Sequence, residues 1–320
     1  KESYPTIDKT ITGVTGQGAV EDTNSANVAV GDIVEFTLTA NLPSNLAVYD
    51  DGYYFEFIDT MSNGLDYIGI SSVTIGGTAN TNYTATPTTA GGQSISVKWN
   101  DISSETGAAA GAAVVVKYTA RVTADAATGV SANNNNKAKI KYSNDPYSDG
   151  KGESTEIEVK VYTFEVKVIK TNAGGFLAGA GFVLKNSEGK YYKFVEASGS
   201  TPAAVTWVEN VDDADEFTSN DTDGTLDGTF TGLAEGTYTL VENTVPTPYN
   251  KADDIEFTIS ASPKADTSTP DNGITVTLTS DATFSGGDTG IATTTVLNQT
   301  GAELPSTGGG KFSKIGRAHV

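Results

Sequence analysis

The sequence predicts an all-β protein made of two β-sandwich domains in tandem, followed by a flexible tail. Apolar and polar residues alternate with a period of two in many short segments, and clusters of Gly, Asn, Asp and Pro separate these segments. No sustained helical period interrupts them. Hydrophobic residues make up 37% of the 320 residues, a composition typical of folded domains and not of disordered chains. We therefore expect one domain at residues 1–162, a second at 163–300 and the tail at 301–320.

The expected strands follow one another at the spacing of a β-sandwich. In the first domain they cover residues 7–11, 34–40, 53–59 and 136–142. In the second domain they cover residues 164–170, 182–184, 191–194, 238–240, 255–259, 274–278 and 293–297.

The composition excludes several classes of protein. The chain has no cysteine, so it can form neither disulfides nor thiolate metal sites. Its net charge of −20 argues against binding to nucleic acid or to anionic membranes, because both need clustered Lys and Arg. We expect an exported protein that needs no cofactor.

An acidic stretch at residues 212–224 resembles a calcium loop with oxygen ligands. Against the EF-hand pattern, Ser219 stands at the first ligand position, and Phe230 stands where a bidentate Glu is needed. A solvated hairpin loop is the simpler interpretation, and we expect no bound metal.

Each half of the chain places three polar side chains in phase with the apolar, inward face of its strands. Burying a lone charge is costly, and a buried group usually shifts its pKa and becomes neutral. One interpretation is that each residue caps a strand end with its charge in solvent. The other is a pair of reactive clusters, formed by Lys9, Asp59 and Asn136 and by Lys170, Glu242 and Asn298.

The reactive interpretation predicts an internal isopeptide bond between lysine and asparagine in each domain. Burial would leave the lysine amine neutral and nucleophilic, and it would keep the acid protonated, so that the acid can move protons while ammonia leaves. We expect Lys9 to join Asn136 with Asp59 as the proton shuttle. Among the neighbouring asparagines only Asn134 has the same parity as Asn136, so it is the alternative partner for Lys9. Each bond would link the first strand of its domain to a late one.

In the second domain we expect Lys170 to join Asn298, with Glu242 as the proton shuttle. Lys170 continues the inward face of its strand, whereas Lys167 should point to solvent. The bond would clamp the domain directly before the tail.

The tail contains Leu304, Pro305, Ser306, Thr307 and Gly308, which resemble the LPXTG sorting signal of Gram-positive surface proteins. The resemblance implies that a sortase cuts after Thr307 and transfers its carbonyl to an amine. A simple turn in a disordered tail is the alternative. The apolar span that normally follows such a signal is missing here. Residues 315–320 resemble a translated sequencing adaptor, and on that interpretation His319 is not part of the natural protein.

The second half resembles the Cna-type B domain of pilins. Residues 170–172 and 177–184 are similar to the opening of that family, and residues 232–242 are similar to the run that leads into its E-box. Five positions match the box: Tyr238, Leu240, Glu242, Pro246 and Tyr249. Three depart from it: Asn243, Val245 and Pro248. The resemblance implies an immunoglobulin-like (Cna-type) sandwich in which Glu242 is the acid of the box.

The first half is similar to the middle domain of sortase-assembled backbone pilins. The similarity rests on residues 5–9, 28–32, 59–65 and 136–146. In that family a preceding domain ends in a V-Y-P-K-like motif, whose lysine accepts the next subunit. No such motif is present, and Lys1 lacks the Tyr-Pro before it.

The resemblance as a whole implies a structural pilus subunit, outside the cell and anchored to the cell wall, and not an enzyme beyond its self-catalysed bonds. Its partners would be a sortase, neighbouring pilin subunits and peptidoglycan. The alternative is an ancillary pilin or single-chain adhesin that binds a host protein or glycan. A wall-anchored glycosidase ranks last, because the acids lack an aromatic-lined cleft signature.

Overall fold

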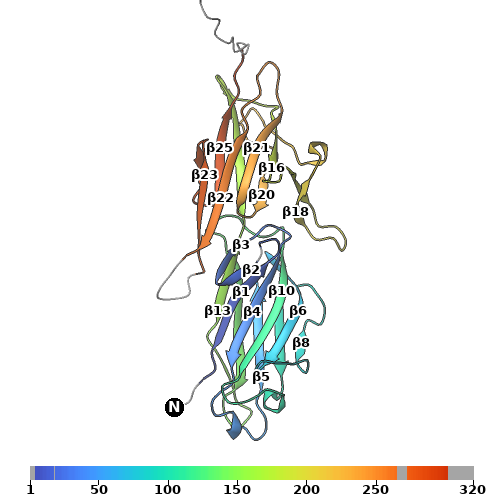
Figure 1. Cartoon of the computed structure of the whole chain (residues 1–320), viewed down its shortest axis with the longest axis vertical. Coiled ribbons are helices and arrows are strands. Elements are labelled where there is room, and N and C mark those ends of the chain that lie inside the picture. Colours follow the sequence, from blue (N-terminus) through green and yellow to red (C-terminus); the bar gives the residue numbers. More distant parts are fainter. Residues whose placement is uncertain (1–3, 18, 265–271, 302–320) are drawn as a thin grey trace, which may run out of the picture.

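The computed structural model describes residues 4–17, 19–264 and 272–301. Four β-sheets form two sandwiches, which stack end to end along the longest axis of the molecule (Figure 1). The all-β prediction is therefore confirmed. Within these described ranges, no helix is long and apolar enough to cross a membrane.

The first sandwich consists of the strands from β1 to β13. One sheet has six strands, in the order β2 (Ala19–Thr23), β1 (Ile7–Val14), β4 (Ile33–Asn41), β10 (Ala113–Val122), β6 (Leu65–Ile75) and β7 (Thr78–Ala79). The facing sheet has seven strands: β3 (Ser25–Asn27), β13 (Ile157–Tyr162), β11 (Asn134–Ser143), β5 (Phe55–Met61), β9 (Ser94–Trp99) and β8 (Thr84–Thr86) in order, with β12 (Lys151–Glu153) paired to β11.

The second sandwich consists of the strands from β14 to β25. Its five-stranded sheet has the order β15 (Gly175–Phe176), β14 (Phe164–Asn172), β25 (Ile291–Leu297) and β24 (Phe284–Ser285), with β20 (Phe230–Leu233) paired to β14. Its seven-stranded sheet has the order β18 (Ala204–Val208), β17 (Tyr191–Val195), β16 (Gly181–Lys185), β21 (Gly236–Thr244), β22 (Ile255–Pro263) and β23 (Ile274–Ser280), with β19 (Phe217–Thr218) paired to β16. Short 3-10 helices lie at Leu46–Val48, Ile102–Ser104 and Val211–Asp213.

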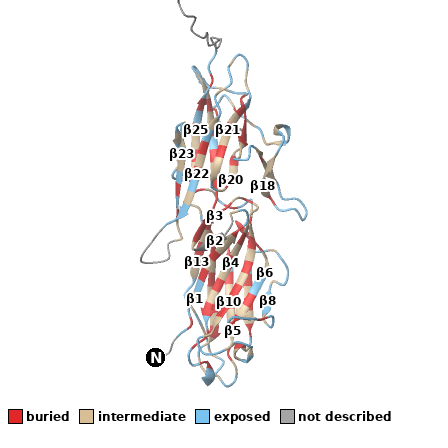
Figure 2. Cartoon of the chain, in the orientation of Figure 1, coloured by how far each residue is buried: buried red, intermediate tan, exposed pale blue. Residues whose placement is uncertain are grey.

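Each core is formed by strands in which buried and partly exposed side chains alternate. In β4 and β10 every second side chain is buried, and the residues between them are partly exposed or lie on the outer face. Buried residues accordingly form two cores, one inside each sandwich, and alternate with partly exposed residues along the strands (Figure 2). A fully buried aliphatic or aromatic side chain contributes about 1.5–3 kcal/mol to folding, so a polar side chain in the same phase must be compensated by hydrogen bonds.

The two sandwiches meet through main-chain hydrogen bonds. The N–H of Val30 donates to the carbonyl of Gly232 (3.0 Å), and the carbonyl of Val30 accepts from the N–H of Val205 (2.9 Å). Gly31 has a φ of +95°, and a Cβ atom at this position would lie 2.5 Å from that of Ala204. Glycine at this position therefore allows the close approach of the two domains.

Candidate functional site: two buried clusters of lysine, carboxyl and asparagine

Three strands of the first sandwich bring Lys9, Asp59 and Asn136 together between the two sheets. Lys9 comes from β1, Asp59 from β5 and Asn136 from β11. Each follows the inward phase of its strand, and the three side chains are between 0% and 2% exposed. β5 and β11 are neighbours in one sheet, whereas β1 belongs to the facing sheet, so the lysine reaches across the sandwich.

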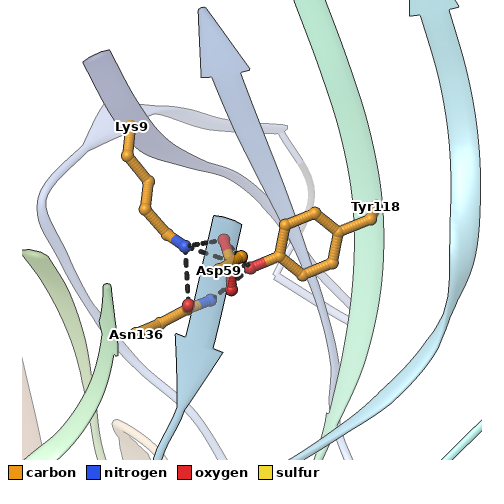
Figure 3. Close-up of polar contacts among 4 residues, drawn as sticks. All are labelled: Lys9, Asp59, Tyr118 and Asn136. Carbon is orange, nitrogen blue, oxygen red and sulfur yellow. Dashed lines mark hydrogen bonds and ion pairs between the residues drawn. The ribbon is translucent and has the colours of Figure 1, made fainter. Parts of the chain in front are cut away.

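The lysine amine lies at the centre of this cluster (Figure 3). Nζ of Lys9 donates to Oδ2 of Asp59 at 2.5 Å and to Oδ1 of Asn136 at 2.6 Å. It also lies 3.1 Å from the hydroxyl of Tyr118, which comes from β10. The carbon that carries Oδ1 of Asn136 therefore lies close to the amine, which also contacts the carboxyl group of Asp59.

Burial controls the charges of the cluster. It lowers the pKa of Lys9 and raises the pKa of Asp59, although the attraction between the two groups opposes both shifts. Burial also raises the pKa of Tyr118 well above its usual value. These directions favour a neutral amine beside a protonated carboxyl group.

Asn134 and Asn136 share one face of β11 but make different contacts. Asn134 bonds the main chain: its amide accepts from the N–H of Ala127 and donates to the carbonyls of Ala127 and Val161. Asn136 instead contacts Lys9 and Tyr118. Asn134 thus holds the loop before β11, and Asn136 is the asparagine beside the amine.

The second sandwich contains the corresponding residues in a looser arrangement. Lys170 on β14, Glu242 on β21 and Asn298, directly after β25, are between 0% and 2% exposed. Nδ2 of Asn298 donates to Oε1 of Glu242 at 2.7 Å. Nζ of Lys170 donates to the main-chain carbonyls of Val296 (3.0 Å) and Thr171 (3.2 Å), and not to Asn298.

Two features of the second cluster bear on its chemistry. Burial lowers the pKa of Lys170 to about 8, although the attraction of Glu242 opposes this shift. The lowered pKa increases the neutral, nucleophilic fraction of the amine at neutral pH. Oδ1 of Asn298 is buried and has no hydrogen-bond partner among the described residues. An unpaired buried oxygen is costly, by about 1–3 kcal/mol, and each such case in a native fold calls for an explanation.

Lys167 lies on the same strand as Lys170 and points to solvent, where it pairs with Glu165 at 3.2 Å.

The acidic stretch forms a short 3-10 helix and turns, in which Asn220 and Asp223 accept hydrogen bonds from nearby backbone N–H groups. No group of three or more His, Cys, Asp and Glu residues in the described part of the chain could hold a metal ion. The sorting-signal residues 304–308 lie outside the described residues.

The sequence reasoning missed Tyr118. Its strand, β10, was not among the expected ones, although Val114, Val116, Ala120 and Val122 alternate around the tyrosine and all are buried. The phase of the strand could have identified Tyr118. A tyrosine in an apolar phase is ordinary, however, so its hydroxyl does not stand out as a buried charge does.

Comparison with known proteins supports the likeness to pilins at the level of fold. Residues 164–273 match the family described as SpaA, prealbumin-like fold domain. No curated protein sequence matches the chain.

Solved structures of pilins have a similar fold. The group B streptococcus pilus 2b backbone protein is 23% identical, with a TM-score of 0.61, over 93% of this chain and 99% of that one. The T6 backbone pilin of serotype M6 Streptococcus pyogenes is 19% identical, with a TM-score of 0.62, over 94% of this chain and 71% of that one. BcpA, the major pilin subunit of Bacillus cereus, is 18% identical, with a TM-score of 0.57, over 94% of this chain and 71% of that one. Residues 164–273 are therefore similar to the SpaA prealbumin-like family, and the chain shares, over most of its length, the fold of solved Gram-positive major pilins.

Proposed function

We propose that this chain is a structural subunit of a surface pilus, of the backbone type. We also propose that an isopeptide bond between a lysine and an asparagine cross-links each of its two domains. The proposal rests on one observation: the buried amine nitrogen of Lys9 lies 2.5 Å from Oδ2 of Asp59 and 2.6 Å from Oδ1 of Asn136. A subunit of this kind is a building block and a substrate of sortase. Its only chemistry is the formation of its own cross-links.

In the first domain, the neutral amine of Lys9 attacks Cγ of Asn136. A bond forms between Nζ and Cγ, the bond between Cγ and Nδ2 breaks, and the amide nitrogen leaves as ammonia. The proton that Nζ loses is the one that the leaving nitrogen gains, so no oxidant or other reagent is consumed. Asp59 lies against the amine and can take up and return protons during this exchange.

In the second domain, the same reaction joins Lys170 to Asn298, with Glu242 as the acid. For this reaction the amine must first leave the carbonyls of Val296 and Thr171, through a change of the lysine rotamer. The unpaired oxygen of Asn298 supports this movement, because it is a buried acceptor without a donor, and Nζ of Lys170 already bonds the carbonyl of Val296, two residues before Asn298. The bond would join the first strand of the domain to its end.

Intact-mass measurement tests both bonds at once. Each bond releases one ammonia, so the folded protein should be lighter than its sequence mass by about 34 Da, twice the roughly 17 Da of ammonia. Peptide mapping after proteolysis should then find one cross-linked pair from each domain. A mass equal to the sequence mass in the folded protein would contradict the proposal.

The proposed attachment to other subunits and to peptidoglycan goes through Thr307. Incubation with a cognate sortase and an amine acceptor should give a product that ends at Thr307, because the enzyme attacks this carbonyl and releases Gly308 and the residues after it. Thr307→Ala serves as the matched control and should not react. Products cut elsewhere, or no product while an LPXTG peptide reacts, would show that the segment is not a sorting signal.

One observation favours the alternative, a binding function for an ancillary pilin or adhesin. A groove of about 520 Å³ opens at the end of the first domain that faces away from the second. Tyr147 beside it is 93% exposed. Aromatic faces among a few polar groups are typical of small-ligand sites, and five tyrosines line this groove: Tyr4, Tyr49, Tyr53, Tyr142 and Tyr147.

A further inference from the structure

The two clusters differ in what contacts the nitrogen that must leave. In the second domain, Oε1 of Glu242 accepts directly from Nδ2 of Asn298 at 2.7 Å. In the first domain, Nδ2 of Asn136 donates to the hydroxyl of Tyr118 at 2.6 Å. Among the described residues, no hydrogen bond joins Asp59 to Asn136.

The hydroxyl of Tyr118 connects the carboxyl group to the leaving nitrogen. It donates to Oδ2 of Asp59 at 2.9 Å, and this is the same oxygen that accepts from Nζ of Lys9 at 2.5 Å. The other carboxyl oxygen, Oδ1, has no partner in the described part of the chain. A continuous path of hydrogen bonds therefore runs from the attacking nitrogen through Asp59 and Tyr118 to the leaving nitrogen (Figure 3).

The position of the hydroxyl is held by packing. Tyr118 is 1% exposed, and its ring stacks on that of Phe36 with the centroids 5.4 Å apart. On the other side it contacts the ring of Tyr67 at 6.2 Å. A buried ring between two others has little freedom to move, so its hydroxyl is preorganised at the point where the proton is needed.

We propose that Tyr118 is a catalytic residue for the bond between Lys9 and Asn136, because its hydroxyl delivers the proton that releases ammonia. The role rests on the proposed function, since it presupposes that this bond forms. As Nζ bonds to Cγ, this carbon becomes tetrahedral, and the lone pair of the leaving nitrogen is no longer delocalised into the carbonyl group. The hydroxyl proton of Tyr118 moves to this lone pair, Asp59 returns a proton to the tyrosine oxygen, and Nζ gives one proton to Asp59. The net change moves one proton from Nζ to Nδ2.

The difference in acid between the domains has the same explanation. Aspartate is one methylene shorter than glutamate. Glu242 contacts its leaving nitrogen without help, whereas Asp59 is bridged to its own by the tyrosine hydroxyl. In the first domain Asp59 and Tyr118 thus act together, whereas in the second domain Glu242 alone takes the role of both.

The test is Tyr118→Phe, which removes the hydroxyl and keeps the ring. General acid catalysis contributes about 10²–10⁴-fold, so bond formation in the first domain should slow by about 100-fold or more. Intact mass followed over time, with peptide mapping, should show the second-domain bond at its normal rate and the first-domain bond delayed. Tyr53→Phe is the matched control, because it removes a hydroxyl from the core of the same domain without touching Tyr118, and it should link as the wild type does.

Rescue separates a chemical role from a packing role. In the double variant Tyr118→Phe, Asp59→Glu the longer acid can reach Asn136 directly, so the first-domain bond should return. In a Trp207→Phe background, fluorescence of the buried Trp99 reports whether the first domain is folded. A folded double variant that stays unlinked, or a Tyr118→Phe chain that links at the wild-type rate, overturns the role of Tyr118 and leaves the bond itself standing. A wild-type chain without the first-domain bond overturns both.

Discussion

Replacing Asn136 with alanine should lower the free energy of unfolding of the first domain by about 3–5 kcal/mol, the range expected for a cross-link that closes a long loop. The bond from Lys9 to Asn136 would close almost the whole domain, from β1 to β11. Without it, the unfolded chain regains the freedom that the cross-link removes. Denaturant unfolding of the variant and of the wild type would measure the difference.

Two further variants separate the bond from other effects of the substitution. Asn135→Ala changes the neighbouring asparagine, which points to the other face and contacts Glu158, so it should cost little. Lys9→Met removes the nucleophile and fills a similar volume, so it should destabilise the domain about as much as Asn136→Ala does. Equal stability of Asn135→Ala and Asn136→Ala would show that no cross-link was lost.

Glu242→Ala should leave the second domain folded but stop the bond between Lys170 and Asn298. The carboxyl group holds Nδ2 of Asn298, and no other acid contacts this amide among the described residues. Its loss should slow bond formation by about 100-fold or more. By intact mass the variant should retain about 17 Da more than its doubly linked form, the mass of one ammonia.

The matched control for this variant is Glu256→Ala, which removes an exposed carboxylate from β22 of the same sheet. It should form both bonds. The first-domain bond of Glu242→Ala provides an internal standard in the same molecule. An unchanged second bond in Glu242→Ala would remove this residue from the mechanism.

The phase of the strands made much of the site predictable. Lys9, Asp59 and Asn136 could be identified because a polar side chain interrupts an otherwise apolar face, and this pattern is local to each strand. The contacts between them depend on which strands face each other, which is set by the packing of the two sheets. The sequence therefore predicted the members of the cluster, whereas the structure supplied the distances and the hydroxyl of Tyr118.

Other features had no local signal. Strands of two or three residues, such as β7, β15 and β24, exist because a longer neighbour offers a free edge, and no alternation can show in so short a segment. The direction of the Lys170 amine depends on the rotamer of the side chain, and the alternation of apolar and polar residues along a strand does not predict rotamers. The contact of Val30 with the second domain joins residues far apart in the chain. Propensity and periodicity do not report such contacts.

The pairing of β14 with β25 has a mechanical consequence. The two strands are parallel neighbours from Glu165 and Ile291 to Thr171 and Leu297. The start of β14 adjoins the first domain, and the end of β25 leads to the tail, so a pull on the two ends of the domain slides the strands past each other. All hydrogen bonds between them then resist together, in shear, and none can be opened one at a time from an end. With the proposed bond from Lys170 to Asn298 in place, tension crosses from β14 directly to the tail. Residues 171–297 then carry no load, and the domain transmits force as an inextensible link.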